Sequence, residues 1–166
     1  MNDPREATMD TAEFRRIMGH FATGVAVVTS RDARTGAPCG LTVNTLTSVS
    51  LRPMLVLVCV EKGADSHDCI LGAGCFAINL LGEEQERLSR RFAGWDVEEK
   101  FRGVPYRTEA TGAPVLEEAM GWLDCRVQAA YPAGDHTIVV GEVLAGDVRD
   151  EPPLIYYRGG YGRFAP

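Results

Sequence analysis

The sequence predicts a mainly β protein, an antiparallel barrel that carries a few short helices. Several apolar segments of strand length follow one another closely, with turn residues between them. Only two segments have a clear helical period. The alternation of strands and helices that is typical of a doubly wound sheet is missing. The 166 residues suffice for one domain with a sizeable core, which we expect over residues 10–166 after a flexible tail of residues 1–9.

The first expected element is a helix over residues 14–21. Asp10 and Glu13 have the spacing of a capping box, and apolar residues follow at helical intervals. Gly24 is expected to end this helix. A second helix is expected over residues 83–92, where acidic residues begin the segment and arginines end it, as the helix dipole favours.

The other periodic segments are expected to be strands. Those before the second helix are residues 24–30, 39–43, 54–60 and 75–81. Residues 31–38 predict a turn that pairs the first two as a hairpin. The unbroken apolar run of residues 54–60 predicts a strand covered on both faces. Residues 65–71 predict one or two helical turns.

A long ordered loop is expected over residues 93–114, and loops of this length often carry function. The strands expected after it are residues 122–129, 137–148 and 154–157. The alternation in the first of these turns Asp124 outward. Gly141 predicts a bend or bulge in the second.

Composition and charge narrow the class of protein. The hydrophobic and charged fractions, 45% and 24%, are ordinary for a soluble globular chain. The formal charge of -6 disfavours nucleic acid or an anionic membrane as partner. The polar start does not resemble a secretory signal, and the longest apolar run is too short to cross a bilayer. Five scattered cysteines are expected to be free thiols, which favours a cytoplasmic protein without a bound metal.

Several common catalytic motifs are missing from the sequence. There is no G-x-G-x-x-G between a strand and a helix, no P-loop lysine motif and no G-x-S-x-G. Rossmann-type dinucleotide binding, P-loop phosphoryl transfer and α/β-hydrolase chemistry are therefore disfavoured.

Residues 40–50 are rich in Ser, Thr and Asn. Such residues are common at a solvated strand edge. However, Thr42 and Asn44 alternate with apolar residues, so their polar groups would line one face and could hydrogen-bond the edge of a flat heterocycle. Both interpretations stay open at this point.

A second polar group surrounds Ser66 and His67. With Lys62 nearby, the start of a helix here could bind a phosphate monoester. Asp65 stands against this interpretation because its charge would repel an anion. A plain helix cap formed by Asp65 or Ser66 explains the same residues.

Two further groups lie near the end of the chain. His136, where a turn meets a strand, could line the mouth of a pocket or be an ordinary surface residue. Arg158 lies among tyrosines and could clamp an anion, or the aromatic residues around it could close the barrel.

The order of these segments is more specific than any one of them. The helix of residues 14–21 is followed by TGVAVVT, GLTVNTLTSVS, FAINLL, RFAG, KF, PVL, GDHTI and YRGGY. This series resembles the flavin reductase components of two-component, flavin-dependent monooxygenases, which belong to the split-barrel FMN-binding superfamily. The likeness runs from about Phe14 to Tyr161, and its most specific parts are residues 42–44 and 134–136.

The resemblance implies a homodimer of split, Greek-key β-barrels with NAD(P)H:flavin oxidoreductase activity. Hydride would pass from NADH or NADPH to FMN or FAD, and the reduced flavin would supply a separate monooxygenase. His136 would be the catalytic residue, orienting the nicotinamide. The implied cofactor-binding residues are Thr42, Asn44, Thr45, Ser48, Lys62, Ser66, His67, Phe92, Lys100, Arg158 and Tyr161. Because relatives often have Ser, Thr or Arg where Asp65 and His67 stand here, the choice between FMN and FAD stays open.

Two other functions compete with this one. A barrel that stores or senses flavin without turnover would bind FMN but would not oxidise NADH. An oligonucleotide-binding barrel is disfavoured by the charge of -6 and by the absence of aromatic residues interleaved with Lys and Arg.

Overall fold

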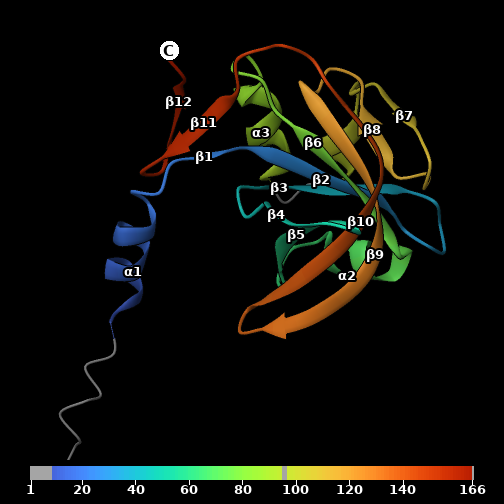
Figure 1. Ribbon diagram of the computed structural model, residues 1–166, viewed down its shortest axis with the longest axis horizontal. Helices are drawn as coiled ribbons and strands as arrows, with labels where there is room; N and C mark the ends of the chain where they lie inside the picture. The colour runs from blue at the N-terminus through green and yellow to red at the C-terminus, as the bar shows by residue number, and fades with distance from the viewer. Residues whose placement is uncertain (1–8, 95–96, 166) are drawn as a thin grey trace, which may run out of the picture.

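The structure, a computed structural model, describes residues 9–94 and 97–165. The main strands in this part of the chain are β2 (Ala26–Arg31), β3 (Pro38–Val43), β4 (Thr47–Leu51), β5 (Met54–Glu61), β6 (Cys75–Leu80), β9 (Gly121–Ala133) and β10 (His136–Val148). They form one sheet in the order β3-β2-β6-β9-β10-β5-β4, and every neighbouring pair is antiparallel. The sheet curls until β3 approaches β5 (Figure 1). The predicted antiparallel barrel is confirmed.

Smaller elements complete the described part of the chain. The short strands are β1 (Thr23–Gly24), β7 (Tyr106–Thr108), β8 (Pro114–Leu116), β11 (Leu154–Tyr157) and β12 (Gly160–Arg163). The helices are α1 (Thr11–Met18), α2 (His67–Ala73), α3 (Glu86–Phe92) and α4 (Val97–Phe101). β1, β11 and β12 form a separate sheet beside the barrel. None of these helices is long and apolar enough to cross a membrane. Of the predicted tail, only Met9 lies within the described residues.

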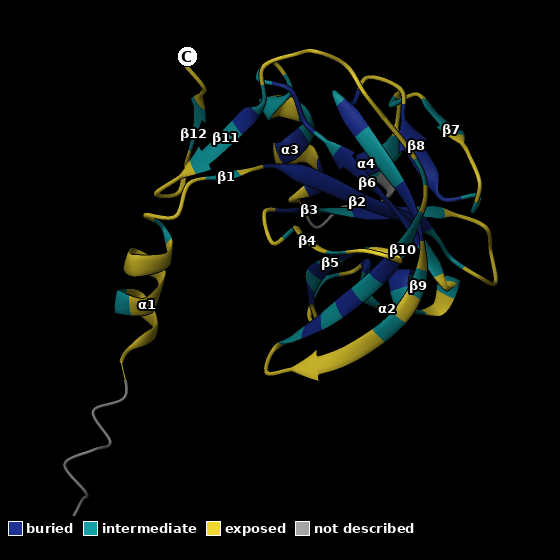
Figure 2. Ribbon diagram, viewed as in Figure 1, coloured by how far each residue is buried: buried dark blue, intermediate teal, exposed yellow. Residues whose placement is uncertain are grey.

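The helix α1 stands away from the barrel (Figure 1) and has no buried residue (Figure 2). Asp10 caps this helix as expected, since its carboxylate accepts a hydrogen bond from the N–H of Glu13 at 2.7 Å. The bounds differ from the expected ones, because the helix begins at Thr11 rather than at residue 14 and stops before Gly19 rather than at Gly24. Gly24 instead pairs with Ile155 of β11, so this glycine belongs to a strand.

The barrel interior is filled by valine and other apolar side chains of β2, β5, β6 and β10. In β5, Val56, Val58 and Val60 are buried while most residues between them are half-buried, so one face of this strand is covered more fully than the other. The bulge expected in β10 is confirmed by a register shift at Gly141. A Cβ at this glycine would lie 2.5 Å from the ring of Phe76, so the packing here requires glycine.

A buried amide joins three parts of the barrel. Asn79 on β6 is fully buried and donates to the carbonyl of Val27 and to the hydroxyl of Thr29, both at 3.0 Å. Its own carbonyl accepts from the N–H of Leu116 at 2.7 Å. Because all of its polar atoms have partners, this amide stabilises the contact between β2, β6 and β8.

The prediction that Asp124 faces outward is wrong. Its carboxylate is fully buried and accepts from both the N–H, at 2.8 Å, and the hydroxyl of Thr111. The expected loop of residues 93–114 folds over this position and contains α4 and β7. A charged side chain placed there is stabilised by hydrogen bonds from the covering segment, which a period-two pattern does not reveal.

The prediction of five free thiols is also wrong. Cys39 on β3 and Cys69 on α2 form a disulfide with a Cα–Cα distance of 6.6 Å. Cys59, Cys75 and Cys125 are free. Burial, followed by the nearby carboxylate of Asp124, raises the pKa of Cys125 to about 12, so this thiol is unreactive at neutral pH.

The disulfide predicts a thiol count and a stability difference. Unfolded, unreduced protein should show three reactive thiols, and reduction should expose all five. Reduction should also lower Tm by roughly 10 °C, because a bridge that closes a loop of about 30 residues contributes about 3–4 kcal/mol. Cys59→Ser, which leaves the bridge intact, is the control. Five reactive thiols before reduction would contradict the bridge.

Candidate functional site

Three adjoining hollows lie along β3 and the turn that follows it. We name them the Met120 hollow, the Tyr161 hollow and the Lys100 hollow after a residue in the lining of each. The first shares Val43 and Asn44 with the second, and the second shares Thr42 and Ala93 with the third. Their volumes are about 240, 200 and 140 Å³. They therefore form one continuous surface on which a long, flat ligand could lie.

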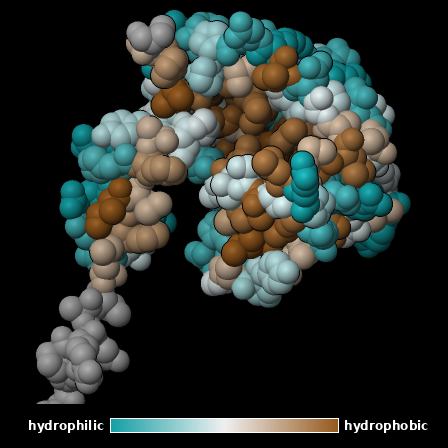
Figure 3. Space-filling model, viewed as in Figure 1, coloured by the Kyte–Doolittle hydropathy of each residue, from teal (hydrophilic) through white to brown (hydrophobic). Residues whose placement is uncertain are grey.

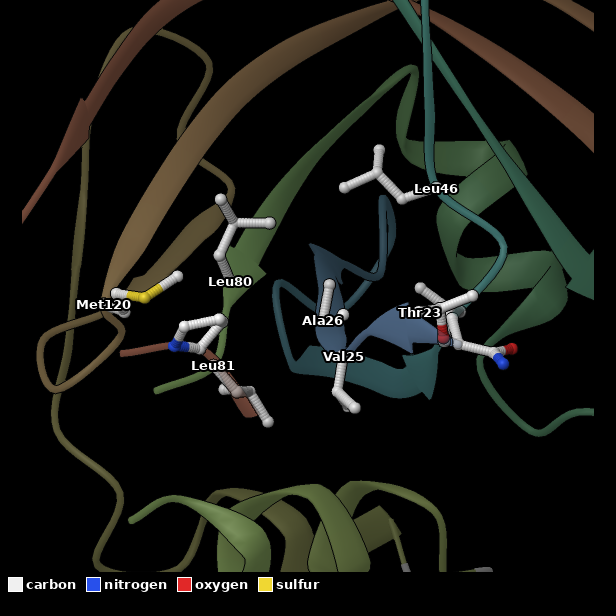
Figure 4. A pocket seen from close by; sticks show the side chains of 11 residues that line it. Thr23, Val25, Ala26, Leu46, Leu80, Leu81 and Met120 are labelled. Atoms are coloured by element: carbon white, nitrogen blue, oxygen red, sulfur yellow. The ribbon is translucent and has the colours of Figure 1, made fainter. Parts of the chain in front are cut away.

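The Met120 hollow is an apolar slot with a polar rim. Leu80, Leu81 and Met120 lie on one side of it and Thr23 on the other (Figure 4). The hydroxyl oxygen of Thr23 is buried and has no hydrogen-bond partner among the described residues. An unpaired buried hydroxyl is unfavourable, so a ligand or water that bonds to it would be stabilised here.

The Tyr161 hollow has an aromatic wall that is held in place. Tyr156 and Tyr161 line it together with Thr42 and Asn44. The hydroxyl of Tyr161 lies 2.7 Å from that of Ser89 on α3, within hydrogen-bond distance. The hydroxyl of Thr42 donates to the carbonyl of Ser89 at 2.6 Å. Through Ser89, α3 is therefore bonded to both β3 and β12, so the position of the wall is fixed by contacts within this chain.

The Lys100 hollow is lined by charged residues. Glu61, Asp65 and Lys100 contribute to it, and Phe92 lies beneath it, fully buried. Lys100 is only 2% exposed, and its ammonium group forms an ion pair with Asp65 at 2.9 Å. The same ammonium donates to the carbonyl of Gly40 at 3.1 Å. Contact between Lys100 and a ligand would require it to leave Asp65.

The polar residues expected after β3 differ in their surroundings. Asn44 is exposed and lines two of the hollows. Thr45 is exposed but joins the turn to β5, since its hydroxyl donates to the carbonyl of Cys59 at 3.0 Å and accepts from the N–H of Cys59 at 3.1 Å. Ser48 is exposed on β4, outside the linings of the three hollows. Asn44 is therefore the best placed of these side chains to meet a ligand.

His136 begins β10 and stands opposite Glu61 of β5. Its ring Nδ1 lies 2.7 Å from a carboxylate oxygen of Asp135, and the side chain is 38% exposed. This hydrogen bond, followed by the charge of the ring, lowers the pKa of Asp135. The carboxylate therefore stays ionised and holds Nδ1, which leaves Nε2 facing away from Asp135.

Arg158 lies apart from His136 in the structure. It occupies the turn between β11 and β12 with a φ of 50°, and its N–H donates to the carbonyl of Gly19 at 2.9 Å. In Figure 1 this turn lies near α1, whereas β10 starts at the hairpin with β9, at the lower edge of the barrel and apart from that turn. The structure therefore does not bring Arg158 close to His136 within one chain, although Tyr161 does line a hollow.

Some site residues were not expected from the sequence. Thr23, Ser89 and Met120 belong to segments far apart in the chain, and no local motif marks them. Only the fold brings them to the C-terminal end of β3, around Thr42 and Val43. The features together define a class of protein, an antiparallel barrel with a continuous surface along β3 that is suited to a flat ligand with a polar edge.

Comparison with known proteins identifies the family. Residues 18–165 match the family model for a flavin reductase like domain. A "Probable flavin reductase" of Rhizobium meliloti (strain 1021) is 43% identical over 92% of this chain, which spans about half (48%) of that relative. The reductase component of 4-nitrophenol 4-monooxygenase/4-nitrocatechol 2-monooxygenase of Rhodococcus opacus is 41% identical, over 95% of this chain and 83% of the relative.

A solved structure gives the same result. The NADH:FAD oxidoreductase of Streptomyces globisporus, in complex with NAD and FAD fragments, superposes with a TM-score of 0.87 and is 37% identical, covering 100% of this chain and 97% of that one. The chain belongs to the flavin reductase-like family, with the split-barrel fold, and it is an NAD(P)H-dependent flavin reductase.

Asn44 provides a test of the site. Replacing it with Ala should raise the Kd for FMN about tenfold, because the rim loses an amide that can pair with the ring edge. Tm should hardly change, since the side chain is exposed. Quenching of flavin fluorescence measures the Kd. Gln128→Ala, an exposed position on β9, is the control. An unchanged Kd would remove Asn44 from the site.

Proposed function

We propose that this chain passes hydride from NADH or NADPH to FMN or FAD held along β3, and that a separate monooxygenase uses the reduced flavin. The observation that carries the proposal is the apolar slot beside Asn44 with the unpaired buried hydroxyl of Thr23. The Rhodococcus opacus relative is named as a monooxygenase reductase component, which supports the same kind of partner here.

The residues present fit a flavin. Apolar walls on β2 and β6 suit the flat faces of its ring, and the polar groups of residues 42–48 suit its edge and ribityl chain. The flavin would supply the redox chemistry as a hydride acceptor. The chain would hold its ring and the nicotinamide stacked, with the reacting atoms about 3–3.5 Å apart. Backbone amides of residues 42–48 are donors that could stabilise negative charge on the ring.

His136 is the residue that we assign to the nicotinamide. It lies opposite Glu61, which lines the Lys100 hollow, and its Nε2 is directed away from Asp135. A histidine held by a carboxylate at one ring nitrogen can orient a neighbouring ligand with the other. Since hydride transfer needs no proton from this ring, we assign His136 an orienting role.

Replacing His136 with Ala should therefore raise the nicotinamide KM about tenfold while kcat stays within about threefold, because uniform binding is lost but the transition state is reached as before. Steady-state rates of nicotinamide oxidation with saturating FMN measure both. Gln128→Ala, at an exposed position on β9, is the control. Complete loss of flavin reduction at saturating nicotinamide would reject the orienting role.

The deciding experiment for the activity mixes purified protein with FMN or FAD and with NADH or NADPH. Loss of nicotinamide absorbance measures turnover and gives both preferences. A barrel that only stores or senses flavin would bind FMN and leave NADH unchanged. That outcome would overturn the proposed function while keeping the flavin site.

We further propose that the protein is a homodimer. Phe14 and Phe21 are 57% and 69% exposed on and after α1, and Leu51 is 85% exposed at the end of β4. Figure 3 shows apolar residues around the hollowed part of the barrel, on the side that faces α1. Exposed apolar surface of this extent favours association. Two copies in which α1 of each packs on the barrel of the other would cover this apolar surface. Arg158 of one copy could then approach His136 of the other.

Charged residues on and after α1 should prevent this association. Replacing both Phe14 and Phe21 with Glu should give a monomer, because each change would bury a carboxylate in the interface. The barrel should keep its Tm within a few degrees, since α1 has no buried residue. Analytical ultracentrifugation measures the mass, and Arg34→Glu, in the turn after β2, is the control. A double variant that stays dimeric would contradict the role of α1.

A cytoplasmic location is also part of the proposal. The cytoplasm holds the reduced nicotinamide that the reaction consumes. The argument from free thiols no longer supports it, because Cys39 and Cys69 are bridged.

A further inference from the structure

The side chains expected near the flavin phosphate are all bonded to other groups of this chain. Ser66 is fully buried, and its hydroxyl lies 2.7 Å from the carbonyl of Gly40. The ammonium of Lys62 donates to the carbonyl of Gly134 at 2.6 Å. His67 has its two ring nitrogens 2.8 Å from Asp68 and 2.9 Å from the hydroxyl of Thr137. A phosphate arriving here would have to compete with existing partners.

Asp65 has the largest effect on this arrangement. Both of its carboxylate oxygens lie 2.9 Å from the ammonium nitrogen of Lys100. The third donor position of that ammonium is taken by the carbonyl of Gly40 at 3.1 Å. Lys100 therefore has no free donor, and its charge is neutralised by a carboxylate whose side chain is 19% exposed.

The charges around the Lys100 hollow also disfavour a phosphate. Glu61 and Asp65 are acidic, and Lys100 is the cation among the lining residues, so the formal sum is one negative charge. A phosphate monoester carries up to two negative charges at neutral pH. At the edge of a partly buried hollow, this repulsion is screened less than in bulk water.

We propose that Asp65 determines how this flavin reductase distinguishes among flavins. By holding Lys100 as its own counter-ion, Asp65 withholds that cation from the flavin phosphate, so that affinity comes from the ring and the ribityl chain. Asp65 is thus a specificity-determining residue that acts through Lys100. The inference rests on the proposed function, because it assumes that flavin lies along β3 with its phosphate toward the Lys100 hollow.

Riboflavin and FMN provide the test, because they differ only by the phosphate. The wild-type protein should bind the two with Kd values within about threefold of each other. Asp65→Asn keeps the shape of the side chain and frees the charge of Lys100. This variant should bind FMN about tenfold more tightly and riboflavin as before. The ratio of the two Kd values is a readout that a merely structural role would not change.

Asp68→Asn is the matched control. It removes the same charge from the start of α2, but its side chain is fully exposed and pairs with His67 rather than Lys100. Its ratio of Kd values should equal that of the wild type. An equal increase in FMN affinity in both variants would mean that general charge, not Asp65, sets the preference, and would overturn the proposal.

A double variant covers the case in which Asp65→Asn fails to fold with an unpaired buried lysine. Asp65→Asn with Lys100→Met removes both charges. Replacing a buried ion pair with uncharged residues of similar size is often neutral for stability. It should keep the wild-type ratio, because the wild-type Lys100 does not contact the phosphate. A selective loss of FMN binding in the double variant, or an unchanged ratio in folded Asp65→Asn, would overturn the proposal. Failure of the wild type to bind riboflavin and FMN alike would instead contradict the proposed function.

Discussion

The structure around the site depends on the absence of a side chain at Gly40. A Cβ at this position would lie 2.9 Å from the carbonyl oxygen of Val28 and 3.1 Å from the ring of Phe92. The first distance is too short for a methyl group against a backbone oxygen, and the second would require the ring to shift, so glycine lets β3 and α3 approach this closely. The carbonyl of Gly40 in turn accepts hydrogen bonds from Ser66 and Lys100. One residue therefore fixes β3 relative to three helices.

This contact explains why the hollows lie where they do. β3 is an edge strand of the main sheet, so on one side it has no strand neighbour to define its position. Helices take that place, since Ser66 at the start of α2 and Lys100 on α4 bond to the carbonyl of Gly40. On the face of the strand, α3 packs Phe92 against Gly40, and the carbonyl of Ser89 bonds to Thr42. The strand then continues to Asn44 as a free edge with polar groups. An edge strand held by helices can offer its polar groups to a ligand without inviting another strand.

Much of the fold could be predicted from the sequence, because its strands are long and strongly patterned. β5, β6, β9 and β10 were expected within a few residues of their observed bounds, as was the bulge at Gly141. The errors lie where distant segments meet. The bridge between Cys39 and Cys69 joins residues 30 positions apart, and the burial of Asp124 depends on a loop that folds back over β9. Neither leaves a local signal. β12 was missed because two of its four residues are glycines.

The site could be predicted only in part for a related physical reason. A hydroxyl or amide side chain can pair with a backbone carbonyl or with a ligand, and the residue type does not distinguish the two. Thr42, Thr45 and Ser66 turn out to bond to this chain's own backbone, whereas Asn44 stays exposed. The charged residues of the sequence carried more information about the site than the hydroxyl and amide residues did. Asp65 stood out in the sequence as an acid at a place suited to an anion, and the fold pairs it with a buried lysine 35 residues away. An acid that conflicts with an expected anion site is therefore a reason to look for a cation that it neutralises.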